Sequence, residues 1–281
     1  MLLVAGCGGG NTRDGPLRVV ASTNVYGDIL RQIGGPHVSV TSVLNEPNTD
    51  PHLFEPGTAT GLAIARASLV VQKGLGYDSF MNRIEDAAPS KRRRVLTVAD
   101  IVGERGANAN PHLWYDVRAM ETVAGAIGRA LAQADPAHRR AYAAGSRGFV
   151  ASLRPVDRAI HTIRGKNAST PIAYTETVPE YLVAATGLVN VAPASFARAV
   201  EQGTEPSASA LSEMTSHVEG PRVRALLYNE QAVSPITAQI RTAAMRAGIP
   251  VVPVTETLPR GLSYQAWMLR QLRDLARAVD R

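Results

Sequence analysis

The sequence predicts an α/β fold in two halves, each built on a parallel sheet, with a long helical segment between them. Short apolar runs alternate with helical patterns in the first and last thirds of the chain. Such strand–helix–strand succession implies parallel strands joined by right-handed crossovers. Residues 117–163 between these thirds keep helical periodicity. A chain of 281 residues is long enough to form one large domain or two modest ones, each with its own core.

The first half begins with an apolar run that ends in small residues, which is typical of a buried strand. The following helical pattern stops at Gly34-Gly35-Pro36, a combination that ends helices. Residues 38–44 alternate between apolar and polar side chains and therefore predict a second strand. The expected elements are a strand at 17–22, a helix at 26–33, a strand at 38–44, a helix at 58–67 and a strand at 68–72.

The helical segment has two internal prolines. Asp135-Pro136 predicts a fresh start, because proline suits the first turn of a helix. Pro155 predicts a kink or a second restart. The last third then resumes the α/β pattern, with strands expected at 171–174, 223–228 and 251–254 and helices at 180–186, 208–218, 236–247 and 264–279. The predicted boundaries are 17–134 for the first lobe, 135–164 for the bridging helix and 165–281 for the second lobe.

The net charge is +6, carried almost wholly by scattered arginines. The one dense basic run, residues 91–94, precedes the apolar pair Val95-Leu96 and is predicted to be a solvated loop that enters a strand. No nucleic-acid-binding motif is present, so nucleic acid is not an expected partner. No apolar run approaches the roughly 20 residues that span a bilayer.

The single cysteine, Cys7, excludes an internal disulfide. Val4-Ala5-Gly6-Cys7 resembles a bacterial lipobox, in which a signal peptidase cuts before the cysteine and the thiol is acylated. The glycine-rich residues that follow would form a flexible tether. Residues 1–16 are therefore predicted to be a truncated signal segment and tether, with a lipid on Cys7 as the membrane anchor. The alternative is a cysteine in a frayed terminus.

Four side chains that can bind metal are predicted to follow strands. His52 and His112 each stand between a proline and a leucine, and Glu176 and Glu256 each stand in the tripeptide Thr-Glu-Thr. Ligands of parallel α/β sheets bind at the carboxyl ends of the strands. Two imidazoles and two carboxylates supply four metal donors. The prolines before the histidines would restrict the loop backbone and reduce the entropy lost on coordination.

Each of these residues also has a purely structural interpretation. Phe54 and Trp114, which follow the two histidines, are suited to core packing, and a glutamate after a strand is suited to helix capping or to solvent. The remaining histidines lack a proline frame and are expected to be surface or hydrogen-bonded rings; they are His37, His138, His161 and His217. Glu230 is either a surface acid or an acceptor that orients a ligand histidine.

A zinc hydrolase is the alternative function for the same residues. His52, His112 and one glutamate would bind zinc, and the other glutamate would act as general base. A catalytic zinc keeps an open position for water, whereas a binding site closes its shell with protein donors. The sequence contains no H-E-x-x-H or other hydrolase metal motif, which counts against the enzyme.

Residues 50–56, Asp-Pro-His-Leu-Phe-Glu-Pro, and residues 110–114, Asn-Pro-His-Leu-Trp, resemble the two metal-ligand signatures of the zinc and manganese solute-binding proteins of ABC importers. This family is also called cluster A-I or cluster 9. The resemblance runs from Leu17 to the end, since Thr175-Glu176 and the segments 228–231 and 254–256 fall in family order. It implies two α/β lobes joined by one long rigid helix. The metal would be held in the cleft between the lobes by His52, His112, Glu176 and Glu256.

The sequence departs from the family pattern in ways that bear on the metal. Glu256 stands where the family commonly has aspartate, Glu176 stands where many zinc receptors have a third histidine, and the long His-rich loop of those receptors is absent. Two imidazoles with two carboxylates form a harder site than three imidazoles, which favours manganese or ferrous iron, whereas the affinity order favours zinc. Zinc and manganese both remain expected.

The resemblance implies a receptor and not an enzyme. A monomeric, lipid-anchored protein outside the cytoplasm would capture a divalent transition metal and present it to a membrane permease driven by an ATPase. Ligand histidines have to be neutral to bind metal, so affinity is expected to fall on acidification.

Overall fold

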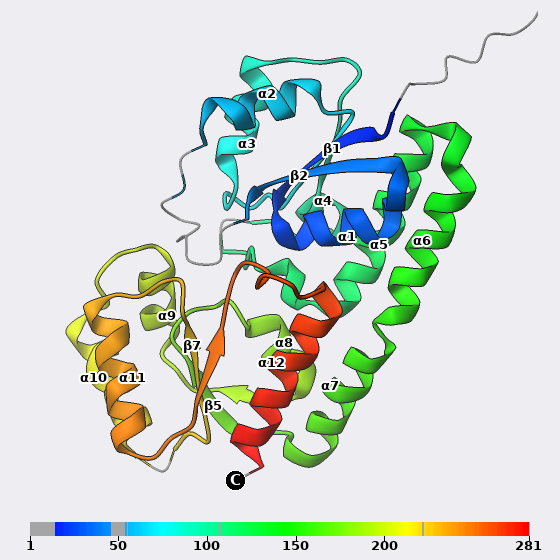
Figure 1. Cartoon of the computed structure of the whole chain (residues 1–281). Coiled ribbons are helices and arrows are strands. Elements are labelled where there is room, and N and C mark those ends of the chain that lie inside the picture. The colour runs from blue at the N-terminus through cyan, green and yellow to red at the C-terminus, as the bar shows by residue number, and fades with distance from the viewer. Residues whose placement is uncertain (1–14, 46–53, 55, 107, 221, 281) are drawn as a thin grey trace, which may run out of the picture.

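A computed structural model describes residues 15–45, 54, 56–106, 108–220 and 222–280 of the chain. Within these residues the chain forms two four-stranded parallel sheets, one in each lobe, with strand orders β2-β1-β3-β4 and β6-β5-β7-β8 (Figure 1). The predicted fold class, two parallel-sheet α/β lobes, is therefore confirmed. The strands are β1 (Leu17–Thr23), β2 (Val38–Leu44), β3 (Leu69–Gln72), β4 (Arg94–Thr97), β5 (Pro171–Tyr174), β6 (Val189–Asn190), β7 (Leu226–Asn229) and β8 (Val251–Val254).

The N-terminal lobe is centred on β1, whose apolar side chains are buried. Val19 pairs with Val40 of β2 on one side and with Leu69 of β3 on the other. Such near-continuous β-branched and leucine positions are typical of parallel strands covered by helices on both faces. The helices of this lobe are α1 (Asn24–Gly34), α2 (Thr58–Arg66), α3 (Ser79–Ala87) and α4 (Val98–Val102), with a 3₁₀ turn, η1 (Gly35–His37), after α1.

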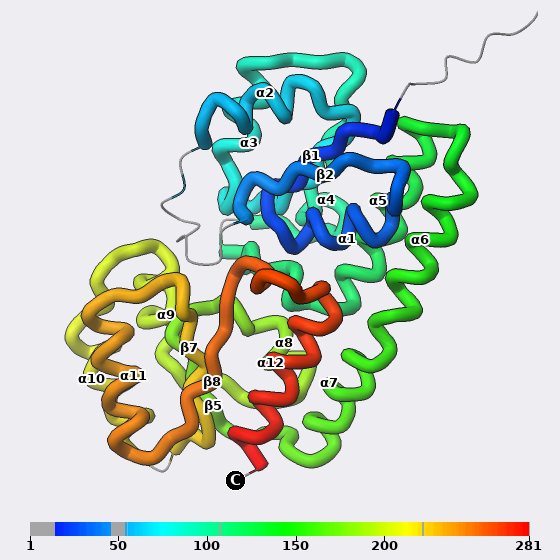
Figure 2. The backbone as a smooth tube through the Cα atoms, in the orientation of Figure 1, coloured from blue at the N-terminus to red at the C-terminus, as the bar shows by residue number. Residues whose placement is uncertain are grey.

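Two helices run end to end along one side of the molecule and pass both lobes (Figures 1 and 2). They are α6 (Arg139–Ser152), which packs on α1, and α7 (Arg154–Asn167), which packs on α8 and α12. Only Leu153 separates them, and Pro155 occupies the first turn of α7. The predicted restart at Pro155 is therefore confirmed. The preceding elements are η3 (Leu113–Tyr115), α5 (Val117–Ala134) and η4 (Pro136–His138).

The C-terminal lobe repeats the strand order of the first. Because β6 lies outside β5, the neighbours β5 and β7 come from segments separated by more than fifty residues, with Ala173 paired to Leu226. The helices of this lobe are α8 (Glu180–Thr186), α9 (Ala194–Glu201), α10 (Ala208–Glu219), α11 (Pro235–Arg246) and α12 (Tyr264–Val279).

One hydrophobic core extends through both lobes. It continues from β1 and α1 through α5, α6 and α7 to α12, which contributes the buried Tyr264 and Trp267. Hydrogen bonds also connect the two lobes along this interface. Asn24 of α1 and Leu258 exchange two hydrogen bonds of 2.8 Å, and the Tyr264 hydroxyl donates to the Trp114 carbonyl at 2.7 Å. The lobes are thus packed against each other as well as connected by α6 and α7.

The short elements α3, β4, α4, β6 and α9 were only partly anticipated. Each is short, and the edge strand β4 begins at the exposed Arg94.

The basic run 91–94 was predicted to be solvated, which is wrong for Arg93. Its guanidinium donates to the carbonyls of Ile64, Glu85 and Ala88. These carbonyls lie near the ends of α2 and α3, where a cation is favourable. Among the described residues no helix is long and apolar enough to cross a membrane.

The packing of α6 on α1 generates a stability prediction. A Cβ on Gly145 would lie 2.3 Å from the Ile33 carbonyl oxygen, whereas a Cβ on Gly148 of the same helix would meet nothing within 4 Å. We expect Gly145→Ala to destabilise the protein by about 1–3 kcal/mol through overpacking. Gly148→Ala should raise the free energy of unfolding by up to about 1 kcal/mol, because alanine favours the helix. Urea unfolding measures both, and equal stability of the two variants would contradict this account of the helix contact.

Candidate metal centre

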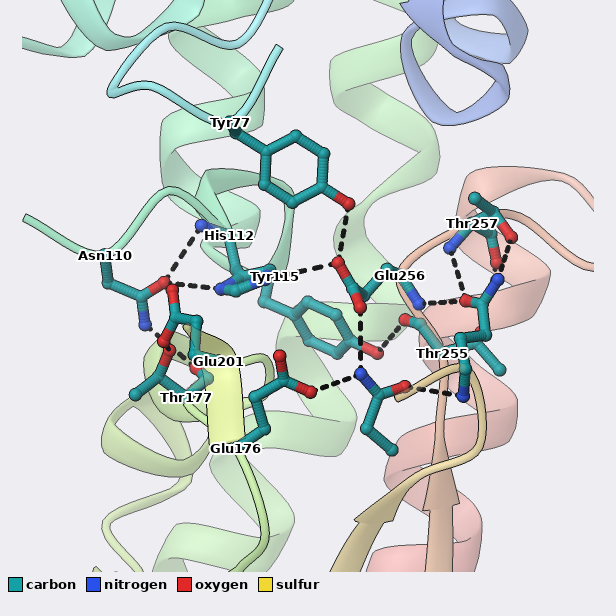
Figure 3. A network of polar contacts seen from close by, with 12 residues as sticks. Tyr77, Asn110, His112, Tyr115, Glu176, Thr177, Glu201, Thr255, Glu256 and Thr257 are labelled. Atoms are coloured by element: carbon teal, nitrogen blue, oxygen red, sulfur yellow. Dashed lines mark hydrogen bonds and ion pairs between the residues drawn. The ribbon is translucent and has the colours of Figure 1, made fainter. Parts of the chain in front are cut away.

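The candidate site lies where loops of the two lobes meet (Figure 3). Glu176 follows β5 and Glu256 follows β8, so both stand at the carboxyl edge of the C-terminal sheet. His112 comes from the N-terminal lobe, directly before η3, and Tyr77 comes from the loop between β3 and α3. His112, Glu176 and Glu256 are each 1% exposed or less. This is the edge at which parallel α/β sheets bind ligands.

Asn110 fixes the orientation of His112. The Asn110 Oδ1 lies 2.8 Å from His112 Nδ1 and also accepts the His112 backbone N–H at 2.9 Å. The amide orientation is determined by its other end, because Asn110 Nδ2 donates to the Thr177 carbonyl and to Glu180 Oε2, which are both acceptors. An oxygen at 2.8 Å requires a proton on Nδ1, so in the neutral ring the lone pair is on Nε2. That nitrogen lies 3.5 Å from Glu256 Oε2.

The two glutamates share one donor. Asn229 Nδ2 donates to Glu176 Oε2 at 2.5 Å and to Glu256 Oε1 at 2.9 Å. Asn229 is the last residue of β7, which lies between β5 and β8, so its amide reaches the loops after both neighbours. Buried carboxylates are costly unless they are hydrogen-bonded or paired with a cation. One amide group therefore holds both acids at the same point.

Two further side chains position Glu256. The Tyr77 hydroxyl donates to Glu256 Oε2 at 2.5 Å across the lobe interface. Burial raises the pKa of Tyr77, and the Glu256 carboxylate raises it further, so the hydroxyl keeps its proton and remains a donor. On the other side, Gln231 Oε1 accepts the backbone N–H groups of Glu256 and Thr257 at 2.6 and 3.0 Å. The loop and the carboxylate are both held in place.

Aromatic rings enclose the imidazole. The Trp114 and Tyr77 rings lie 5.1 and 5.8 Å from the His112 ring in edge-to-face geometry. Trp114 is fully buried, and Phe54 packs on Phe80 at 5.3 Å, so both aromatic residues of the Pro-His motifs pack as their structural interpretation predicted. The low-dielectric walls strengthen electrostatic interactions within the site.

The structure brings three of the four predicted ligands together, directly or through Asn229. His112 and Glu256 are in contact, and Glu176 joins them through the shared amide. His52 lies outside the described residues. Within the described part of the chain, no three His, Cys, Asp or Glu side chains are close enough to hold one metal ion.

The sequence did not reveal the residues that orient these side chains. Glu230 was a candidate acceptor for a ligand histidine, but its side chain is exposed, and the neighbouring Asn229 faces the site instead. Successive residues of a strand point to opposite faces, so an error of one position changes the residue that reaches the site. Tyr77 lies in a loop with no motif to identify it.

The other histidines lie away from the candidate site. His37 stacks on His138 at 3.8 Å, and His138 Nδ1 lies 2.7 Å from Asp135 Oδ2. His161 bonds a carbonyl of its own helix. These rings agree with the prediction of surface or hydrogen-bonded histidines, whereas His217, a residue of α10, is largely buried, with 8% exposure.

Comparisons with known proteins place the chain in a family. Residues 19–278 match the family model described as ZnuA, zinc-uptake complex component A, periplasmic. The manganese-binding lipoprotein MntA of Halalkalibacterium halodurans is 28% identical over 166 residues, 57% of this chain and 55% of that protein. The metal ABC transporter substrate-binding lipoprotein ScbA of Streptococcus cristatus is 24% identical over 160 residues, 52% of this chain and 51% of that protein. The matches thus span about half the length of these two relatives.

A solved structure shares the fold over a greater length. The periplasmic zinc-binding protein TroA of Treponema pallidum superposes with a TM-score of 0.77 at 18% identity, covering 95% of this chain and 100% of that chain. The names of these relatives describe binding proteins and not enzymes, so the hydrolase alternative gains no support from them. Since the family model covers nearly the whole chain, the protein belongs to the zinc-uptake complex component A family, as its Pro-His motifs predicted.

Proposed function

We propose that this protein is an extracytoplasmic receptor that captures zinc or manganese between its lobes and delivers the ion to an ABC permease and its ATPase. One observation carries the proposal. His112 from one lobe and Glu256 from the other are in contact in a buried seam, with Glu176 tied to Glu256 through Asn229. The names of the relatives support transport of a metal.

The proposed ligands are His52, His112, Glu176 and Glu256. His112 offers Nε2, since its Nδ1 is bonded to Asn110. A divalent cation would compensate the two buried carboxylates, which accept hydrogen bonds from the uncharged side chains of Asn229 and Tyr77. Protons compete with the metal for these imidazole and carboxylate donors, so affinity falls as the pH falls. The step is capture and release, with no bond made or broken in a substrate.

Zinc and manganese both suit this donor set. Carboxylate oxygens suit manganese and ferrous iron, and imidazole nitrogens suit zinc. The relatives divide in the same way, since MntA is named for manganese and TroA for zinc. A monomer suffices for the proposed site, because all four ligands belong to one chain.

Loss of a ligand should weaken metal binding more than it affects folding. For His52→Ala, His112→Ala, Glu176→Gln and Glu256→Gln, we expect losses in Zn²⁺ and Mn²⁺ affinity greater than the roughly 10- to 100-fold caused by losing an outer hydrogen-bond partner. Isothermal titration calorimetry on chelator-treated protein measures these losses, and thermal melts check the fold. Glu230→Gln, next to Asn229 but exposed, is the matched control and should bind as wild type. Unchanged affinity in both histidine variants would refute the site.

Asn110 should affect metal binding through His112. Asn110→Ala removes the acceptor that keeps the proton on His112 Nδ1, and we expect affinity to fall roughly 10- to 100-fold. Asn110→Asp keeps an acceptor there and should recover part of the loss. Glu180→Ala removes an interlobe partner of Asn110 but leaves the histidine contact intact, so its affinity should stay near wild type. Equal losses in Asn110→Ala and Glu180→Ala would assign the effect to the lobe contact instead.

We further propose that a lipid on Cys7, which lies outside the described residues, anchors the protein to the outer face of the membrane. One acyl chain binds a membrane reversibly, and stable anchoring takes two signals, such as dual acylation. In a bacterial host that exports the protein, wild type should fractionate with membranes and incorporate labelled palmitate. Cys7→Ser should do neither, with metal affinity unchanged. Membrane association of Cys7→Ser equal to wild type would exclude the anchor.

A further inference from the structure

Lys73 carries a buried amino group that the proposed metal chemistry does not use. It directly follows β3 and is 0% exposed. Its Nζ has no hydrogen-bond partner in the described part of the chain. It lies instead 3.1 Å from the centroid of the Tyr77 ring and 3.5 Å from that of Trp114. An ammonium in an apolar setting is costly unless other charges or ring faces compensate it.

Both rings that hold Lys73 belong to the candidate metal centre. The hydroxyl of Tyr77 is bonded to Glu256 Oε2, and the Trp114 ring lies beside the His112 imidazole. One tyrosine ring thus separates the ammonium from the Glu256 carboxylate. Asp78 is the other nearby acid, but its oxygens already accept the backbone N–H groups of Lys73 and Gly74 at 2.6 and 3.0 Å. Glu256 is therefore the site carboxylate that Lys73 can compensate.

Three effects act on the charge of Lys73. Burial lowers the pKa of its ammonium well below the usual value, and the carboxylates of Glu256 and Asp78, which raise this pKa, offset only part of that effect. The two aromatic faces favour the charged form, because their negative quadrupoles attract a cation and not a neutral amine. Two rings placed on one nitrogen at such short distances are the arrangement expected for a retained ammonium.

We propose that Lys73 is the resident counter-charge of the metal centre. Its ammonium compensates Glu256 when no metal is bound, and it repels a divalent cation that enters the same field. In a low-dielectric site such repulsion acts through one intervening ring. Lys73 therefore lowers the affinity for metal and favours release to the permease. This inference rests on the proposed function, because it assigns the residue a role only if the site binds metal.

The test compares Lys73→Met with Lys166→Met on the exposed face of α7. Methionine keeps an unbranched side chain, one atom shorter than that of lysine, and removes the charge. Both variants lose one positive charge, but only the first loses it beside the site. We expect Lys73→Met to bind Zn²⁺ roughly tenfold or more tightly and to release it more slowly to a chelator. Lys166→Met should match wild type. Lys73→Gln serves as a second neutral variant, and circular dichroism checks that each variant is folded.

The other outcomes separate this inference from the proposed function. If wild type binds Zn²⁺ and both Lys73→Met and Lys73→Gln bind it with the same affinity as wild type, the ammonium does not act on the metal. The inference is then overturned. If the folded variants bind more weakly, Lys73 supports or ligates the metal, and the inference is again overturned. If wild type binds neither Zn²⁺ nor Mn²⁺, the proposed function itself fails.

Discussion

Burial of the Glu256 carboxylate is the constraint on which the site depends. A carboxylate removed from water has to be matched by donors or by a cation. The C-terminal lobe supplies the Asn229 amide, the N-terminal lobe supplies the Tyr77 hydroxyl, and Lys73 lies behind the tyrosine ring. Neither lobe satisfies this acid alone. The buried carboxylate therefore has two effects: it draws donors from both lobes to the site, and it makes the site attractive to a cation.

The strand order explains how residues distant in sequence reach this acid. In the C-terminal sheet, β7 lies between β5 and β8, so Asn229 stands between the loops that carry Glu176 and Glu256. An amide at the end of the central strand can donate to both neighbours, whereas one on an edge strand can reach only a single neighbour. After the edge strand β6, the chain crosses to the other side of β5 and forms β7 there. This crossover places one asparagine between the two glutamates.

Much of this arrangement could be predicted from the sequence. Alternating apolar runs and helical patterns predicted the α/β lobes, and the Pro-His and Thr-Glu-Thr motifs directed attention to the loops after strands. The supporting residues could not be found in this way. To identify Asn229, one has to know the strand order and which residues at the end of β7 point towards the site. Glu230 was selected instead, one position away, and its side chain is exposed.

Tyr77 and Lys73 are harder still to predict. Tyr77 reaches Glu256 across the lobe interface, and Lys73 contacts rings from two separate segments of the N-terminal lobe. Contacts of either kind leave no periodic pattern in one segment. A lysine directly after an apolar run is ordinarily expected to reach solvent. Only the three-dimensional structure places its ammonium under two aromatic rings.

The seam between α1 and the last helix has a consequence for how the chain folds. Asn24 and Asp28 bond to Leu258 and Tyr264, residues more than 230 positions later. Closing so large a loop costs entropy before any contact repays it, and non-local pairing of this kind slows folding. The N-terminal lobe therefore cannot complete its inner face as an independent unit. That face is covered only when the final helix docks, so the native packing of both lobes depends on contacts between segments far apart in the sequence.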